Sequence, residues 1–73
     1  MKVARAIKDA KIFLNEHPIF GEEERLRAEA GKEKMEEMYN YLLASKRLAE
    51  AEQVRQVISE LNTALFYYHI AYA

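Results

Sequence analysis

The chain has 73 residues, of which 51% are hydrophobic and 32% are charged, and its formal net charge is −1. This size and composition indicate one folded domain with one modest core. The absence of cysteine excludes disulfides and thiolate metal ligands, and the balanced charge lacks the basic excess that is typical of nucleic-acid binding. No apolar run approaches the roughly 20 residues that span a bilayer, and no signal-peptide core is present, so we expect a cytoplasmic location.

The single proline and the first glycine separate a short first helix from the rest of the chain. Pro18 disfavours helical structure at the residue before it, and Gly21 follows closely, so residues 17–21 are predicted as a loop. Before this loop, apolar residues recur with the spacing of one helical face. This pattern predicts a helix over residues 2–16, with a buried face made of Val3, Ile7, Ala10 and Leu14.

A second helix is predicted over residues 22–45. It begins with three consecutive glutamates, whose negative charge suits the N-terminal end of a helix. Small or apolar residues then follow with alternating spacings of four and three, at Ala28, Gly31, Met35, Met38 and Leu42. The small residues Ala28 and Gly31 predict that a neighbouring helix packs closely near the start of this helix.

The break between the second and third helices is not marked by glycine or proline. An unbroken helix from residue 22 to the end would be about 78 Å long, which is too long for a compact monomer. Ser45 is the best available N-cap, so a tight turn is predicted at residues 45–47, followed by a helix over residues 48–72. The core stripe of this helix is predicted to contain Val54, Ile58, Leu61, Leu65, Tyr68 and Tyr72. Because the turn has no glycine, an opened hairpin that exchanges helices between two chains is an open alternative.

Together these elements predict an all-α fold in a single domain over residues 1–73. The second and third helices have similar expected lengths, about 36 and 39 Å, which suits a helical hairpin. The first helix, about 22 Å long, covers only part of that hairpin. The expected architecture is therefore a three-helix antiparallel bundle in which a short first helix packs on a long helical hairpin.

The end of the third helix breaks the amphipathic pattern. Residues 65–73 carry no formal charge, and Phe66 and Ile70 lie about 140° and 180° from Leu61 on a helical wheel. A helix that is apolar on several sides is either buried all round or contacts a partner. We therefore predict a surface that binds a protein partner or a second copy of the chain, formed by Ser59, Asn62, Thr63, Phe66, His69, Ile70 and Ala73. The alternative is that the first helix lies beside the C-terminal part of the third helix and covers this side.

A second candidate for partner binding lies near the hairpin turn. Met38, Tyr41 and Leu42 are expected beyond the reach of the first helix, and adaptable methionine beside tyrosine is common at protein-binding surfaces. The competing interpretation is that these residues belong to the ordinary core, because Met35, Met38 and Leu42 keep helical spacing.

No motif for catalysis, nucleotide binding or metal binding is present. The two histidines, His17 and His69, have no cysteine and no Glu-x-x-His partner, and no phosphate-binding loop occurs. We therefore expect a non-enzymatic interaction module, adaptor or binder without a cofactor, either natural or engineered. The alternative function is a helical bundle that holds a small ligand or cofactor between Tyr, Met and His side chains, which requires an inward His69 and a cavity. A piece of a larger assembly would also show this apolar end.

Two stretches resemble the YheA/YlbF family of small helical bacterial proteins. Residues 3–8, Val-Ala-Arg-Ala-Ile-Lys, resemble the N-terminal Ala-x-x-Ile-Lys pattern of the family. Residues 50–53 and 58–62 resemble its Ala-Glu-Gln and Glu-Leu-Asn elements, with a spacing that is one residue shorter. The long middle portion does not match, and the chain is shorter than family members. The resemblance implies a helical regulator or adaptor that acts through oligomer and partner contacts, and it carries over no catalytic residue.

Overall fold

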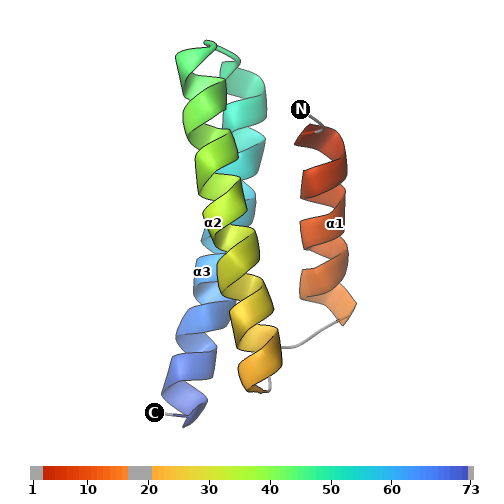
Figure 1. Ribbon diagram of the computed structural model, residues 1–73, viewed down its shortest axis with the longest axis vertical. Helices are drawn as coiled ribbons and strands as arrows, with labels where there is room; N and C mark the ends of the chain where they lie inside the picture. Colours follow the sequence, from red (N-terminus) through yellow and green to blue (C-terminus); the bar gives the residue numbers. More distant parts are fainter. Residues whose placement is uncertain (1–2, 17–20, 73) are drawn as a thin grey trace.

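The computed structural model describes residues 3–16 and 21–72 and contains three α-helices in these ranges. They are α1 (Val3–Glu16), α2 (Glu22–Ala44) and α3 (Leu48–Tyr72). The helices α2 and α3 form an antiparallel hairpin, and α1 lies beside it, antiparallel to α2 (Figure 1). The predicted fold class, a three-helix antiparallel bundle, is confirmed. Residues 17–20 of the predicted loop, residue 2 of the first predicted helix and Ala73 lie outside the described residues.

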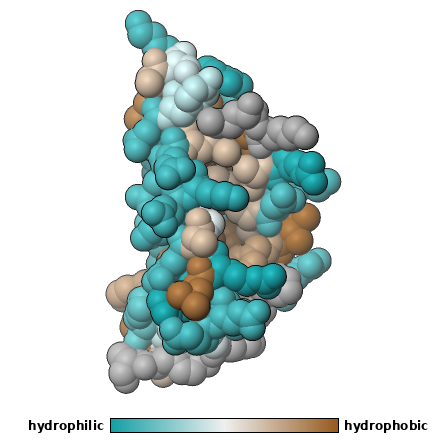
Figure 2. Space-filling view, viewed as in Figure 1, coloured by the Kyte–Doolittle hydropathy of each residue, from teal (hydrophilic) through white to brown (hydrophobic). Residues whose placement is uncertain are grey.

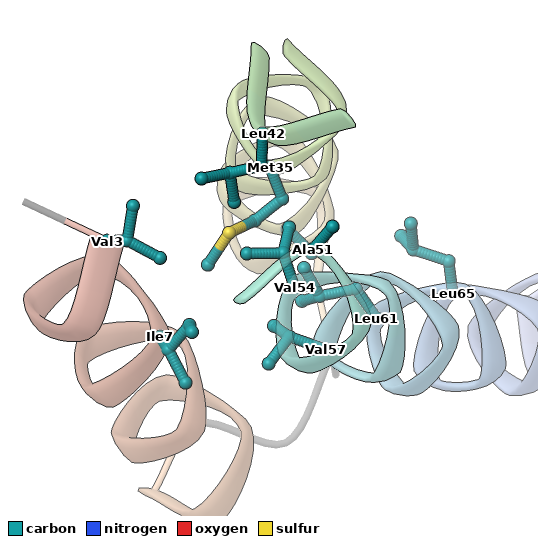
Figure 3. Close-up of a cluster of buried hydrophobic side chains, with 10 residues drawn as sticks. Val3, Ile7, Met35, Leu42, Ala51, Val54, Val57, Leu61 and Leu65 are labelled. Carbon is teal, nitrogen blue, oxygen red and sulfur yellow. The ribbon is translucent and has the colours of Figure 1, made fainter. Parts of the chain in front are cut away.

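The core is formed by apolar side chains from all three helices, which point toward a common centre (Figure 3). The buried residues of α2 recur every seven positions, which keeps one side of that helix against α3. No side chain among the described residues is both buried and polar. The buried side chains are Val3, Ile7, Ala28, Met35, Leu42, Ala51, Val54, Val57, Leu61 and Leu65.

The buried stripe of α3 differs from the predicted core stripe. The predicted member Tyr68 is only half-buried and is not among the buried core residues, and the side chain of Tyr72 lies outside the described residues. Val57 is fully buried, whereas Ile58 is only partly buried and packs on the edge of the core. The reason is the position of α1, which packs more extensively on α3 than on α2. Figure 3 shows Ile7 of α1 facing the side of α3 that carries Val57. The buried arc of α3 is therefore rotated toward α1.

The turn between α2 and α3 is closed by backbone hydrogen bonds. The N–H of Lys46 donates to the carbonyl of Leu43 at 3.0 Å, and the N–H of Arg47 donates to the carbonyl of Leu42 at 2.9 Å. This pair of bonds is a Schellman motif, which requires a left-handed residue after the helix. Lys46 occupies that position with φ 59°. Ser45 is the C-cap of α2, so its predicted role as the N-cap of the third helix is wrong.

The predicted close packing at the start of α2 holds for only one of its two small residues. Ala28 is 1% exposed and belongs to the core. Gly31 is half-buried, but a Cβ placed on it would meet no atom within 4 Å. The prediction for Gly31 is therefore wrong, because α1 leans toward α3 and leaves the side of α2 beside Gly31 open.

Candidate protein-binding surface

The predicted partner-binding residues lie on one exposed side of α3. Phe66 is 60% exposed and Ile70 is 61% exposed. The other described members are exposed as well, and Ala73 lies outside the described residues. We call this surface the outer face of α3; its described members are Ser59, Asn62, Thr63, Phe66, His69 and Ile70.

The outer face is exposed because both neighbouring helices pack on the opposite side of α3. Leu65, one position before Phe66, is 6% exposed and lies in the core. The last turns of α3, drawn in dark blue, extend beyond the end of α1 (Figure 1). The alternative in which the first helix covers Phe66 and Ile70 is therefore wrong for this structure.

Two pairs of neighbouring rings are in contact near the end of α3. Phe66 meets Tyr67 edge-on with ring centroids 5.9 Å apart, and Tyr68 meets His69 edge-on at 5.7 Å. Tyr67 is 65% exposed, so it borders the outer face and enlarges its aromatic part. The sequence prediction missed Tyr67. The position of Tyr67 on the helical wheel, about 120° from Leu61, could have identified it, because this position lies beside the outer face.

The outer face of α3 carries no Asp, Glu, Lys or Arg side chain. The hydroxyl of Thr63 donates to the backbone carbonyl of Ser59 at 3.0 Å, so this donor is already satisfied within the helix. No Asp, Glu, Lys or Arg occurs in residues 61–73. Burial of this part of α3 against another molecule therefore removes no formal charge from water, which avoids the large desolvation cost of burying an ion.

The ion pairs of α3 lie in its first half, and one of them is made with Arg47, the residue before the helix. Arg47 donates from Nε to Oε1 of Glu50 at 2.6 Å, and Arg55 donates to both carboxylate oxygens of Glu52. The hydrogen bond from Arg55 lowers the pKa of the Glu52 carboxyl below its ordinary value. The same bond raises the pKa of the Arg55 guanidinium. The helix is thus divided into a charged first half and an uncharged second half.

The second candidate surface, near the hairpin turn, is only partly available. Leu42 is fully buried in the core, so its assignment to a surface is wrong. Met38 is half-buried and packs against the core, whereas Tyr41 is 48% exposed. Exposed apolar side chains at this end also include Leu43 and Leu48. This surface is interrupted by the charged turn, in which Lys46 and Arg47 lie between Leu43 and Leu48.

A groove of about 570 Å³ runs between α1 and α2. Its floor is apolar, and Figure 2 shows it as pale brown atoms between teal, charged side chains. The residues around it include Ala10, Phe13, Gly31, Met35 and Leu61. None of the described residues that line the groove is a histidine or a tyrosine, and His69 is exposed on α3. The described residues of the groove therefore do not bring together the Tyr, Met and His side chains that the cofactor alternative requires.

Findings on metal sites, membrane spans and similar proteins complete the description of the surface. Within the described ranges, no group of three or more His, Cys, Asp or Glu side chains is placed to hold a metal ion. In the same ranges, none of the three helices has the length and hydropathy needed to cross a bilayer. No family model matches the chain, and no similar curated protein or solved structure was found. The resemblance to the YheA/YlbF family therefore stays a prediction.

Proposed function

We propose that this protein is a non-enzymatic interaction module that binds a protein through the outer face of α3. One observation carries the proposal. Phe66 and Ile70 are 60% and 61% exposed, one helical turn apart, on a helix whose other side is already packed. An apolar side on a helix that the fold does not use indicates a contact with another molecule.

The composition of the outer face supports a protein as the ligand. Large aromatic and aliphatic anchors on successive turns are the elements with which one helix recognises another. Phe66, Tyr67 and Ile70 each expose roughly 100 Å² if a large apolar side chain carries about 150–250 Å². Burying these three side chains favours association by roughly 7 kcal/mol, at about 25 cal/mol per Å², before the costs of association are counted.

The test is the double variant Phe66→Asp/Ile70→Asp. We expect its melting temperature to lie within about 5 °C of the wild type, because substitutions at exposed sites have small effects on stability. The same variant is expected to lose the partner, measured as a protein retained by the immobilised wild type and absent from the immobilised variant.

Two controls make the test specific. Leu26→Asp changes an exposed leucine of α2, which is 53% exposed, and should keep both the melting temperature and the partner. Leu61→Asp places a charge in the core and should unfold the protein. The proposal fails if the double variant melts like Leu61→Asp, or if it retains the same proteins as the wild type.

A further inference from the structure

The outer face of α3 has a spacing that fits a second copy of itself. Its residues recur with alternating separations of four and three, which is the spacing of a helix-pairing seam. Resting on the function proposed above, we propose that two copies of the chain pair through α3 in an antiparallel dimer. The contact is centred between Ala64 and Leu65, and each seam consists of Ser59, Thr63, Phe66 and Ile70.

The sizes of the seam residues select the antiparallel orientation. The first half of the seam has small side chains, Ser59 and Thr63, and the second half has bulky ones, Phe66 and Ile70. In an antiparallel pair with this centre, Phe66 lies opposite the partner's Thr63, and Ile70 lies opposite the partner's Ser59. Bulky and small side chains then alternate across the interface, which is the arrangement that packs without voids. A parallel pair would instead oppose Phe66 to itself and Ser59 to itself.

The symmetry of this contact closes the assembly. Phe66 of one copy contacts Thr63 of the partner, and Thr63 of the first copy contacts the partner's Phe66. Such reciprocal contacts are those of a two-fold symmetric interface. Both copies therefore use the whole seam, and no free seam remains to extend the assembly into a filament. The expected product is a dimer.

The electrostatics of α3 agree with this register. The ion pair of Glu52 and Arg55 lies in the charged first half of α3, outside the four seam positions, so forming the seam does not bury it. Glu60 lies about 120° from Phe66 on the helical wheel and remains at the rim. The hydroxyl of Thr63 already donates to the carbonyl of Ser59. Packing the partner's Phe66 against Thr63 therefore leaves no hydrogen-bond donor of this hydroxyl unsatisfied.

The buried area predicts a weak dimer. Phe66 and Ile70 of the seam and Tyr67 beside it each expose roughly 100 Å², and with the small residues around them they supply roughly 500 Å² per copy. The total of roughly 1,000 Å² is near the lower limit of specific protein interfaces. We therefore expect a dimer that dissociates on dilution rather than an obligate one.

The first experiment measures the solution mass by light scattering over a range of protein concentrations. We expect the wild type to rise from 8.6 kDa toward twice that mass. Ser59→Arg should weaken the dimer at least tenfold, because it places a charge against the partner's Ile70. Its matched control, Ser45→Arg, lies in the exposed hairpin turn and should dimerise like the wild type. Dimerisation that is insensitive to Ser59→Arg overturns the register.

The second experiment distinguishes antiparallel from parallel pairing by single cysteines, since the chain has none of its own. In the proposed register the two copies of residue 63 lie three residues apart along the axis, about 4.5 Å, and their Cα atoms are roughly 7 Å apart. The two copies of residue 59 lie eleven residues apart, about 16 Å. Under mild oxidation, Thr63→Cys should form a disulfide dimer and Ser59→Cys should not.

The control for random collisions is Glu33→Cys on the exposed side of α2, which should cross-link no faster than Ser59→Cys. Equal, fast cross-linking of Thr63→Cys and Ser59→Cys indicates parallel pairing and overturns the proposal. A wild type that stays at 8.6 kDa at all concentrations also overturns it. That result leaves the proposed function standing if Phe66→Asp/Ile70→Asp still loses a different protein partner, so the two failures are distinguishable.

Discussion

The two sides of α3 present similar apolar side chains to opposite environments. On the inner side, Leu61 and Leu65 are 2% and 6% exposed; on the outer side, Phe66 and Ile70 are 60% and 61% exposed. All four lie within three turns of one helix. The difference arises from the neighbours, because α1 and α2 both pack on the inner side. Hydropathy alone therefore does not tell which apolar residue of a helix serves folding and which is left for another molecule.

The largest expected difference between the two sides is in folding stability. Leu61→Ala removes a fully buried side chain and should lower the free energy of unfolding by about 2–5 kcal/mol. Phe66→Ala, on the outer side, should change it by less than about 0.5 kcal/mol at protein concentrations where the chain is monomeric. Urea denaturation followed by circular dichroism measures both values. Equal losses for the two variants would show that the outer side is part of the core.

A smaller effect is expected at the hairpin turn, which belongs to neither side. Lys46 is held in the left-handed region at φ 59°, where a Cβ is unfavourable. Lys46→Gly should therefore raise the free energy of unfolding by about 1 kcal/mol. If the two sides of α3 act separately, this gain leaves the dimerisation constant unchanged in light scattering. A loss of stability on substitution would show that the lysine side chain contributes more than its backbone strain costs.

A similar but slightly smaller gain is expected on α2. At Gly31 a Cβ meets nothing within 4 Å, and alanine favours a helix over glycine. Gly31→Ala should therefore raise the melting temperature by a few degrees, equivalent to about 0.5–1 kcal/mol. Calorimetry of the variant measures the shift, and Gly31→Leu serves as the comparison, since a large side chain enters the α1–α2 groove. A lower melting temperature for Gly31→Ala would contradict an open side at this position.

The smallest effect concerns the charged first half of α3. Arg55 holds the pKa of the Glu52 carboxyl below its ordinary value of 4.5. Because the folded pKa is the lower one, the pair stabilises the fold above pH 4.5, and this contribution is lost as the pH falls through the folded value. Arg55→Gln should raise the pKa of Glu52 toward 4.5 in an NMR titration, with little change in melting temperature, since both groups are exposed. An unchanged pKa would show that the hydrogen bond is absent in solution.

The positions of the helices could be predicted from local signals. Proline and glycine mark the first break, and the limit on helix length marks the second, near Ser45. The capping role of Ser45 could not be predicted, because the left-handed conformation of Lys46 closes the turn without a glycine.

Features that depend on where α1 packs could not be predicted. A wheel centred on Leu61 does not say whether Val57 or Ile58 is more deeply buried, because α1 selects the side. The same displacement of α1 leaves Gly31 open. On the candidate surface, the wheel placed Phe66 and Ile70 correctly on the exposed side, since both lie opposite the core stripe. It missed Tyr67, which lies at the border where exposure depends on the neighbours.

The way α1 is attached has a consequence for local opening of the bundle. This helix contributes two buried side chains, Val3 and Ile7, and contacts α2 only sparsely. Regions with few buried contacts open at a lower free energy than the global unfolding transition, so amide hydrogens of α1 should exchange with solvent before those of the hairpin. Because α1 does not touch the outer face of α3, its detachment leaves that face in place.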